Sequence, residues 1–401
     1  MTPSSLRPSP INAFGRKIGP GEPCFIVAEL SGNHGGDLSR AKQLIHMAKA
    51  SGADAVKLQA YFDASDMTVE ARTPHFRVPG SSPWSGRSLW DLYNEARTPE
   101  EWFPVLFDEG KKAGIPVFAT PFSVRAALYL TQFKPPAFKV ASFEIAHTPL
   151  LDVVGAQARA LKIPVILSTG MATDREITDA RVAIDPFSPK FRETNIILMH
   201  CVSAYPAPAG ELALGEIRRL EENYRLPVGY SDHSLGTAAP AVAVALGACI
   251  IEKHLTADDR LTVDSHFSLR PREFREMVER IREAEQMVKP VITDRDYPPI
   301  EYEWREEISD SGSSRVRTGW YARGAGAHPY PSEQDSMVFR RSLFSARELK
   351  AGVPLTLDDV LVIRPGTGMH PRYLESLVGR TPVRDIPAHE PLREEMFGRN
   401  S

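Results

Sequence analysis

The sequence has few cysteines, no long apolar run and almost no net charge. Its three cysteines, among 401 residues, each lie in an apolar stretch, so we expect buried free thiols rather than a disulfide framework or a zinc cluster. The most apolar stretch, AAPAVAVALGACII (238–251), is too short to span a bilayer. With 48 basic and 51 acidic side chains the formal net charge is -3, so we expect neither a nucleic-acid nor a membrane partner.

Several common signatures are also missing. There is no Walker loop, HExxH, CxxC pair or GxSxG elbow. The first 20 residues lack the apolar core of a signal peptide, so we expect a cytoplasmic protein. Hydrophobic residues at 42% and charged residues at 25% are typical of a globular protein, and the chain is long enough for a large and a small domain.

Eight short apolar runs share one format and predict strands that are buried on both faces. The runs are 24–30, 55–61, 116–122, 137–142, 164–170, 196–202, 227–233 and 249–256. Helix-like segments lie between them, such as 39–52 and 98–114, and both end on glycine. Eight alternating βα units predict an α/β protein with a (β/α)8 TIM barrel. A doubly wound open sheet is the alternative, but no glycine-rich nucleotide turn follows the first run.

The sequence divides into three parts. The barrel pattern fills residues 1–290, and residues 291–336 are dense in Pro, Gly, Ser and charge, which predicts a linker. Residues 337–401 contain two similar stretches and predict a small β-rich domain with two related halves. Within the barrel, the long Trp-rich connection 62–97 is expected to lie over the barrel mouth.

Every apolar run ends in polar residues, and the carboxyl ends of barrel strands form the active site of this fold. The residues at these ends are Glu29, Lys57, Gln59, Thr120, Lys139, Ser142, Ser168, Thr169, Ser203, Tyr205, Ser231, His233, Lys253 and His254. Buried ammonium groups need anionic partners, and Glu29 is the one obvious internal carboxylate. A phosphate or carboxylate ligand would supply the remaining negative charge.

His233 and His254 end two runs that we expect to form neighbouring strands. Two imidazoles with room for water and substrate oxygens suit Mn²⁺, Fe²⁺, Co²⁺ or Zn²⁺ in an open site. Asp232 or Asp264 would be a further ligand or would accept a hydrogen bond from a ligand.

Ordered motifs along almost the whole chain resemble the sialic acid synthase family. They are FIVAELSGNHGGDLSRAKQLIHMAKASGADAVKLQAY, FATPFS, FKVASFEIAHTPLL, ILSTGMAT, HCVSAYPAP, GYSDHSLG and ALGACIIEKHLT. RRSLFSARELKAGVPLTLDDVLVIRPGTGMHP resembles the family's C-terminal SAF domain, an antifreeze-like β-clip module. Motifs such as AELSGNH and GRSLWDLYNEA are most similar to the pseudaminic acid synthase branch, although His266 departs from its pattern and the linker is longer.

The resemblance implies a condensation of phosphoenolpyruvate with 2,4-diacetamido-2,4,6-trideoxy-altropyranose to give pseudaminic acid and phosphate. The implied cofactor is a divalent metal, Mn²⁺ or alternatively Mg²⁺ or Co²⁺. The alternatives within the family are N-acetylneuraminate and legionaminic acid synthases, which use N-acetylmannosamine or a diacetamido-mannose. The resemblance also implies a domain-swapped homodimer, in which the SAF domain caps the partner's barrel.

The resemblance assigns roles to individual residues. By this resemblance, the carboxylate of phosphoenolpyruvate would be bound by Lys57, Gln59 and Thr120. Its phosphate would be bound by Lys139, Ser142, Ser168, Ser203 and Ser231. His233 and His254 would hold the metal, and Glu29 would position or deprotonate water. Tyr205 and Asp264 would line the sugar site, and Arg364 would contact the sugar's N-acyl group.

Two other classes of function stay open from the residues themselves. A Schiff-base aldolase would use Lys139 or Lys57 as its nucleophile and would need no metal. A non-catalytic sugar-acid binding protein would use the same pocket without chemistry.

Overall fold

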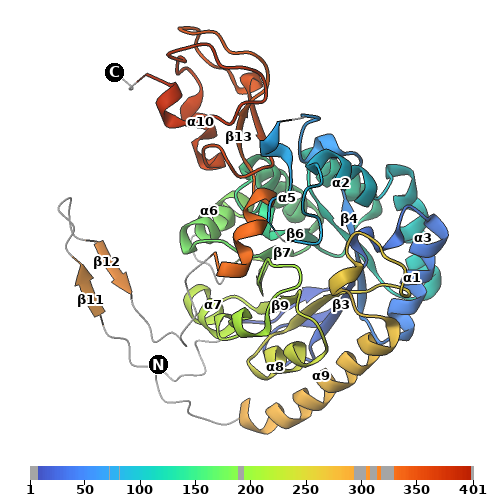
Figure 1. Ribbon diagram of the computed structural model, residues 1–401. Helices are drawn as coiled ribbons and strands as arrows, with labels where there is room; N and C mark the ends of the chain where they lie inside the picture. Colours follow the sequence, from blue (N-terminus) through green and yellow to red (C-terminus); the bar gives the residue numbers. More distant parts are fainter. Residues whose placement is uncertain are drawn as a thin grey trace.

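Eight parallel strands form a barrel in the computed structural model, which describes residues 8–71, 73–80, 82–187, 194–292, 304–307, 314–317 and 329–398. The strands are β3 (Phe25–Glu29), β4 (Ala55–Ala60), β5 (Val117–Pro121), β6 (Phe138–Val140), β7 (Val165–Ser168), β8 (Ile196–Cys201), β9 (Val228–Asp232) and β10 (Ile250–His254). Their order is β5-β4-β3-β10-β9-β8-β7-β6, and β5 lies against β6 where the circle closes (Figure 1). The predicted (β/α)8 barrel is therefore confirmed.

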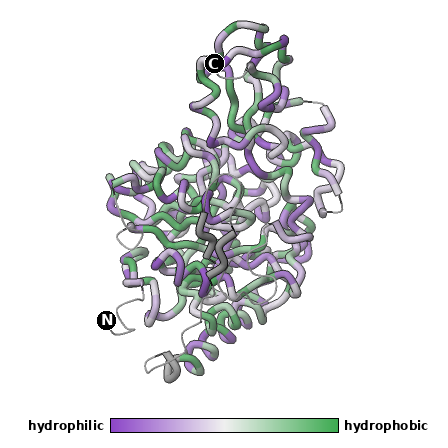
Figure 2. Tube along the Cα trace, turned by 90° about the vertical axis from the view of Figure 1, so that its left-hand side faces the viewer, coloured by the Kyte–Doolittle hydropathy of each residue, from purple (hydrophilic) through white to green (hydrophobic). Residues whose placement is uncertain are grey.

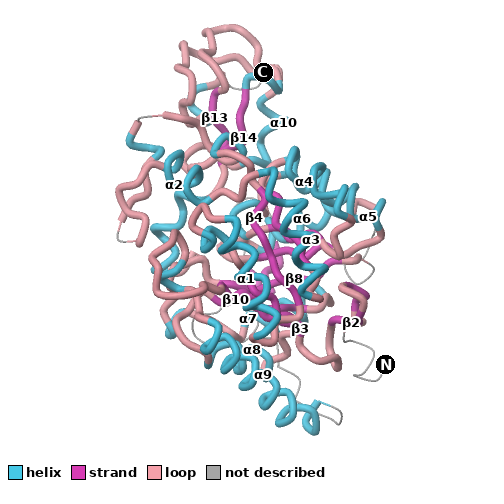
Figure 3. Tube along the Cα trace, turned by 90° about the vertical axis from the view of Figure 1, so that its right-hand side faces the viewer, coloured by secondary structure: helices cyan, strands magenta, loops and turns pink. Residues whose placement is uncertain are grey.

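Helices surround the strands (Figure 3). They are α1 (Leu38–Ala50), α2 (Leu89–Ala96), α3 (Phe103–Ala113), α4 (Val124–Leu130), α5 (Thr148–Leu161), α6 (Asp174–Ile184), α7 (Glu216–Tyr224), α8 (Ala238–Ala245) and α9 (Pro271–Ile292). Sequence signals set several of their ends. The Asp37 carboxylate accepts from the first N–H groups of α1, and Gly114 ends α3 with a φ of 66°.

Apolar side chains fill the amino end of the barrel. The antiparallel hairpin of β1 (Ile11–Ala13) and β2 (Arg16–Ile18) covers this end, and its Phe14 ring lies 5.0 Å from that of Phe118. Apolar segments run through the interior of the molecule and polar segments along much of its outside (Figure 2). Because the amino end is apolar, polar chemistry inside the barrel is confined to the carboxyl end.

The connection 62–97 lies over the barrel mouth, as predicted. It is more regular than expected, because it contains α2, which begins at a Ser88 side-chain cap and packs Leu92 and Tyr93 into an apolar cluster at the mouth. The buried positions of LWDLYNEA recur every three or four residues, which is the spacing of one face of a helix.

The C-terminal domain lies at the same end of the molecule (Figure 1). It contains β13 (Ser342–Ser345), β14 (Val360–Ile363) and α10 (Leu374–Leu377), and most of it is loop (Figure 3). The expectation of a β-rich domain therefore holds only for one antiparallel strand pair and a few isolated bridges. One of these bridges, Leu349 with Ile386, joins the two similar stretches.

Most of the predicted linker 291–336 lies outside the described residues. Within it, β11 (Trp304–Glu307) pairs antiparallel with β12 (Ser314–Arg317), and a 3-10 segment begins at Pro331 and continues to Phe339. The three cysteines are buried and free, as expected. In the described part of the chain, no helix is long and apolar enough to cross a membrane.

The apolar filling of the amino end predicts a large effect of truncating Phe118. Because this side chain is fully buried, Phe118→Ala should lower the free energy of unfolding by about 3–5 kcal/mol. Phe187→Ala is the matched control, because Phe187 is 80% exposed and its loss should cost no more than about 0.5 kcal/mol. Urea unfolding monitored by circular dichroism checks both values, and equal losses would contradict this description of the core.

Candidate active site

A cavity opens at the carboxyl ends of the barrel strands. Its empty volume, including open solvent at its mouth, is about 890 Å³. The predicted residues that line it are Glu29, Lys57, Gln59, Thr120, Lys139, Ser142, Ser168, Tyr205, Ser231, His233, His254, Asp264 and Arg364. Sequence reasoning therefore placed most of the polar lining.

The floor of the cavity carries four buried charged groups. Lys57 Nζ lies 2.8 Å from Glu29 Oε2 and 3.2 Å from Glu252 Oε1, and it donates to Thr120 Oγ1. Lys139 Nζ donates to Ser168 Oγ at 2.7 Å and lies 3.9 Å from Glu252 Oε1. The two ammonium groups thus share one carboxylate between them.

This packing shifts the proton affinities of the four groups. Burial raises the pKa of Glu29 to about 7, against the opposing effect of Lys57. Burial also lowers the pKa of Lys139 to about 8. Although burial acts against both charges, the carboxylates raise the pKa of Lys57, and the ammonium groups of Lys139 and Lys57 lower the pKa of Glu252 to about 2. Glu29 and Lys139 are therefore the groups that can change charge near neutral pH.

Glu252 corrects the expectation that Glu29 is the one internal carboxylate. Positions 252 and 254 of β10 face the same side because side chains alternate along a strand. With His254 assigned to the pocket, this alternation was the signal that would have placed Glu252 beside it. Its Oε1 also accepts from Ser231 Oγ at 2.9 Å.

The same alternation removes Lys253 and Asp232 from the expected pocket. Lys253 Nζ lies 2.6 Å from Asp232 Oδ2 and also donates to the carbonyl oxygen of Ser234. Both side chains are fully buried, and neither lines the cavity. Asp232 is therefore committed to a structural ion pair rather than to a metal.

His233 and His254 face one another at the ends of β9 and β10, with ring centroids 5.7 Å apart. The Nδ1–H of His233 donates to the Val202 carbonyl oxygen at 2.8 Å, and Nδ1 of His254 lies 3.2 Å from Ser31 Oγ. Burial lowers the pKa of His233 to about 4 and that of His254 well below its ordinary value. Both rings are therefore neutral at neutral pH, and His233 Nε2 keeps its lone pair.

Asp264 lines the cavity near these rings and accepts weakly from Gly32 N–H, at 3.4 Å. Burial raises its pKa. Among the residues that the structure describes, no group of three or more His, Cys, Asp or Glu side chains is placed to hold a metal ion. A metal here would have two protein ligands and open positions.

Ser203, like Thr169 and Lys253, is a predicted strand-end residue that does not line the cavity. It is fully buried, and its N–H donates to Glu333 Oε1 at 2.8 Å. The bare Cα of Gly170 allows close approach here, because a Cβ at this position would lie 2.5 Å from Ser203 Oγ and 2.8 Å from Ser142 Oγ. The strand-end argument could not separate this inner position from a lining one.

The outer half of the cavity is aromatic. Its rings come from Tyr61, Trp84, Tyr93, Phe122, Phe143, Tyr205, Phe267 and Phe339. The Tyr205 ring lies 4.5 Å from that of His233 and 5.1 Å from that of Phe267. Sequence reasoning identified only Tyr205 among these. Tyr61 and Phe122 end the predicted runs 55–61 and 116–122, but the strand-end argument considered polar residues, and the remaining rings lie on connections.

Arg364 reaches this aromatic half from the C-terminal domain. Its guanidinium donates to Tyr93 Oη at 2.8 Å and to both oxygens of Glu144, at 2.9 and 3.0 Å. Although burial opposes its charge, Glu144 raises the pKa of Arg364. Its Nε–H has no hydrogen-bond partner among the described residues.

Comparison with known families identifies the family to which this chain belongs. A family model described as the NeuB family matches residues 44–292, and one described as the SAF domain matches residues 340–398. The chain belongs to the NeuB family. The resemblance found in the sequence is thereby confirmed over the barrel and the C-terminal domain.

Individual NeuB-family relatives match most of this chain. A pseudaminic acid synthase from Campylobacter jejuni is 33% identical over 93% of this chain and 96% of the relative. An N,N'-diacetyllegionaminic acid synthase from Legionella pneumophila is 31% identical over 89% of each. The crystal structure of spore coat polysaccharide biosynthesis protein SpsE from Bacillus subtilis superposes with a TM-score of 0.73 at 32% identity, covering 98% of this chain and 100% of that one.

The cavity floor predicts a pH-dependent anion site in this NeuB-family chain. Sulfate binding should weaken as pH rises from 7 to 9, because Glu29 gains its negative charge near pH 7 and Lys139 loses its positive charge near pH 8. Lys139→Gln should bind sulfate about tenfold more weakly at pH 7. Isothermal titration calorimetry measures the affinity, and sulfate keeps a constant charge over this range.

Lys350→Gln serves as the control, because Lys350 is exposed on the C-terminal domain and its charge should not affect the cavity. Sulfate binding that is independent of pH in the unaltered protein would contradict the assigned charge states. Equal losses in the two lysine variants would place the anion elsewhere.

Proposed function

We propose that this NeuB-family enzyme condenses phosphoenolpyruvate with an N-acylated amino-sugar, releasing phosphate and forming a nine-carbon 2-keto acid. Among the acceptors, we propose 2,4-diacetamido-2,4,6-trideoxy-altropyranose, which gives pseudaminic acid. The relatives that match over most of the chain include proteins named as pseudaminic and legionaminic acid synthases.

The observation that carries this proposal is that the floor of the cavity is charged and its outer half is aromatic. Phosphoenolpyruvate is a small polyanion, and the floor offers two ammonium groups among the hydroxyls of Thr120, Ser168 and Ser231. Lys57, with Gln59 and Thr120, would take the carboxylate, and Lys139 with the serines the phosphate. Charge-assisted hydrogen bonds of this kind are the strong ones in a buried site.

The two histidines fit a divalent metal, with Mn²⁺ preferred. Burial keeps both rings neutral, and the Val202 carbonyl fixes the tautomer that leaves His233 Nε2 free to ligate. His233 and His254 would be its protein ligands, with substrate and water oxygens in the other positions. When bound, such an ion supplies Lewis-acid polarisation of the sugar aldehyde.

Glu29 is the proposed acid–base group. In the reaction, carbon 3 of phosphoenolpyruvate bonds to the aldehyde carbon, and the aldehyde oxygen takes up a proton from Glu29. Water then adds to carbon 2 and returns one proton to Glu29. The bond from carbon 2 to the phosphate oxygen breaks, the 2-keto group forms, and the second water proton leaves with the phosphate. A pKa of about 7 suits a group that takes up and releases protons near neutral pH.

The aromatic half of the cavity favours a 6-deoxy acceptor. A methyl group at carbon 6 can be buried against rings such as Trp84 and Phe267, whereas a hydroxyl there would lose its hydrogen bonds to water. Arg364 Nε–H, which lacks a partner among the described residues, is available to an N-acyl oxygen. Tyr205 and Asp264 complete the proposed sugar site.

One observation favours a second candidate, the Schiff-base aldolase. Burial lowers the pKa of Lys139 to about 8, so part of its amine is neutral and nucleophilic at physiological pH. Lys57 does not share this property, because Glu29 and Glu252 keep it charged. Borohydride trapping of a keto acid on Lys139, together with activity in EDTA, would support this candidate over the first.

Phosphate release from phosphoenolpyruvate in the presence of Mn²⁺ tests the proposed reaction. The altrose acceptor should release phosphate at least tenfold faster than N-acetylmannosamine or the diacetamido-mannose, and EDTA should stop it. Faster release with another acceptor would support the proposed reaction and contradict the proposed sugar acceptor. If none of the three acceptors gave phosphate release, the proposal that this protein is a synthase would be overturned.

Glu29→Gln tests the acid–base group. The change should lower kcat by about 10²–10⁴-fold and leave the KM for phosphoenolpyruvate within a few-fold, because the amide keeps the shape and loses the proton affinity. Glu348→Gln, at an exposed site on the C-terminal domain, is the control. An unchanged kcat in Glu29→Gln would remove this residue from the mechanism.

A further inference from the structure

The loop that follows β7 lies on the side of the cavity that the proposed function assigns to phosphate. Ser168 ends β7 and lines the cavity, and Gly170 follows two residues later. The bare Cα of Gly170 packs against Ser142 and Ser203, where a Cβ would lie 2.8 and 2.5 Å from their hydroxyl oxygens. A shift of this loop would therefore disturb the arrangement of three serines at once.

Met171 gives this loop an unfavourable backbone conformation. Its φ is 60°, in the left-handed region that residues with a Cβ rarely adopt. Such a conformation persists where the surrounding contacts hold it in place. One of these contacts comes from Arg340, which directly follows the 3-10 segment Pro331–Phe339 and whose Nη1 donates to the Met171 carbonyl oxygen at 2.9 Å. Arg340 is thus placed to hold the loop from outside the cavity.

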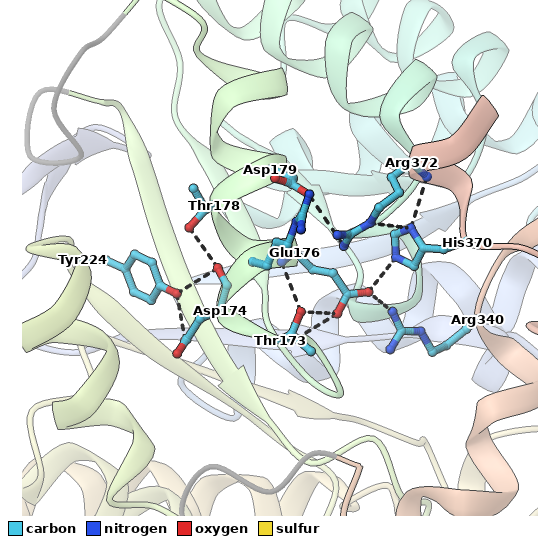
Figure 4. A network of polar contacts seen from close by, with 10 residues as sticks. Thr173, Asp174, Glu176, Thr178, Asp179, Tyr224, Arg340, His370 and Arg372 are labelled. Carbon is cyan, nitrogen blue, oxygen red and sulfur yellow. Dashed lines mark hydrogen bonds and ion pairs between the residues drawn. The ribbon is translucent and has the colours of Figure 1, made fainter. Parts of the chain in front are cut away.

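Arg340 is itself fixed by a carboxylate at the start of α6 (Figure 4). Its guanidinium contacts Glu176 Oε1, which also accepts from His370 Nε2 at 2.9 Å, and Glu176 Oε2 accepts from Thr173 N–H at 2.8 Å. Although burial opposes its charge, His370 and Arg340 lower the pKa of Glu176 to about 2. The carboxylate therefore stays ionised at neutral pH, and it orients the guanidinium toward Met171.

The same segment reaches the neighbouring loop, which follows β8. Glu333 is fully buried, and its Oε1 accepts from Ser203 N–H at 2.8 Å while its Oε2 accepts from Tyr330 N–H at 2.8 Å. Because β7 and β8 are paired, Arg340 and Glu333 hold two adjacent loops at the barrel mouth. Neither side chain lines the cavity. Any effect of theirs on a ligand must therefore pass through these loops.

We infer that Arg340 and Glu333 are positioning residues for an oxyanion site at the barrel mouth, where they hold the loops after β7 and β8 in the arrangement that a phosphate group requires. That this group belongs to phosphoenolpyruvate rests on the proposed function, whereas the binding of a simple oxyanion does not. Both residues act through the loops and do not touch the ligand.

These contacts are compatible with the domain-swapped homodimer that the resemblance implies. Exchange of C-terminal domains between two chains would present the same arginine and glutamate to each barrel, because the two copies are related by symmetry. Each barrel would then receive its positioning residues from the partner chain.

Sulfate binding measured by isothermal titration calorimetry tests the inference without any turnover. At pH 7, Arg340→Gln should bind sulfate about tenfold more weakly than the unaltered protein, because the loop after β7 loses the hydrogen bond at Met171. Glu333→Gln should also weaken binding, because an amide offers one oxygen to the two N–H groups that the carboxylate accepts.

Arg372→Gln is the matched control. Arg372 lies 3.6 Å from Asp179 of α6 at the same interface but does not contact either loop (Figure 4). Its loss should change the sulfate affinity by less than about twofold. An equal loss in Arg372→Gln and Arg340→Gln would overturn the inference, because weaker docking of the domain would then explain both results.

Two further results would also overturn the inference. They are unchanged sulfate affinity in both Arg340→Gln and Glu333→Gln, and an absence of sulfate binding by the unaltered protein at pH 7. If Arg340→Gln does not fold, Arg340→Lys replaces it. The ammonium keeps the charge but lacks the planar fork that serves Glu176 and Met171 together, so sulfate binding should still weaken, by about threefold.

Kinetics separate loop positioning from domain docking once the proposed reaction is observed. Arg340→Gln should raise the KM for phosphoenolpyruvate about tenfold and leave the KM for the sugar acceptor within about twofold. A matching rise in the acceptor KM would overturn the inference, because Arg364 of the same domain lies in the acceptor half of the cavity and would report a displaced domain. Sulfate binding with the expected losses, but without phosphate release, would support the inference and contradict only the proposed function.

Discussion

The pairing of two buried lysines with two buried carboxylates is the constraint on which the site depends. Isolated charges at this depth would be unstable, so each must find a partner within the barrel or on a ligand. Strand register supplies the partners. Glu29 of β3 is paired in register with Lys57 of β4, and Glu252 of β10 is paired with Ser231 of β9. The apolar filling of the amino end then restricts this charged layer to the mouth, where a small anion can reach it.

The C-terminal domain gives this layer its closed surroundings. Arg341 and Arg364 meet at Glu144, so the same carboxylate holds the domain in place and orients a guanidinium toward the aromatic half of the cavity. Closure of this kind excludes water and strengthens every electrostatic interaction beneath it. Domain docking and the position of the Arg364 guanidinium are therefore coupled through one buried acid.

The barrel could be predicted from sequence because each strand is a short apolar run followed by polar residues. The same rule located Glu29, Lys57, Lys139 and the two histidines, but it treated every strand-end residue as equivalent. It therefore included Lys253, which faces away from the cavity, and it missed Glu252, which faces inward. Most of the aromatic half was not predictable in this way, because contacts between distant connections place rings such as those of Trp84 and Phe339, whereas Tyr61 and Phe122 end predicted runs. The family resemblance supplied Arg364, which nothing in its local sequence distinguishes from a surface arginine.

The most direct test of this charged layer as a phosphoenolpyruvate site is a crystal structure of the protein with phosphoenolpyruvate and Mn²⁺. The expected result is phosphoenolpyruvate between Lys57 and Lys139, with an anomalous Mn²⁺ peak bound by His233 and His254. Phosphoenolpyruvate at another place, or these four side chains unchanged and without ligand at saturating concentration, would contradict the assignment.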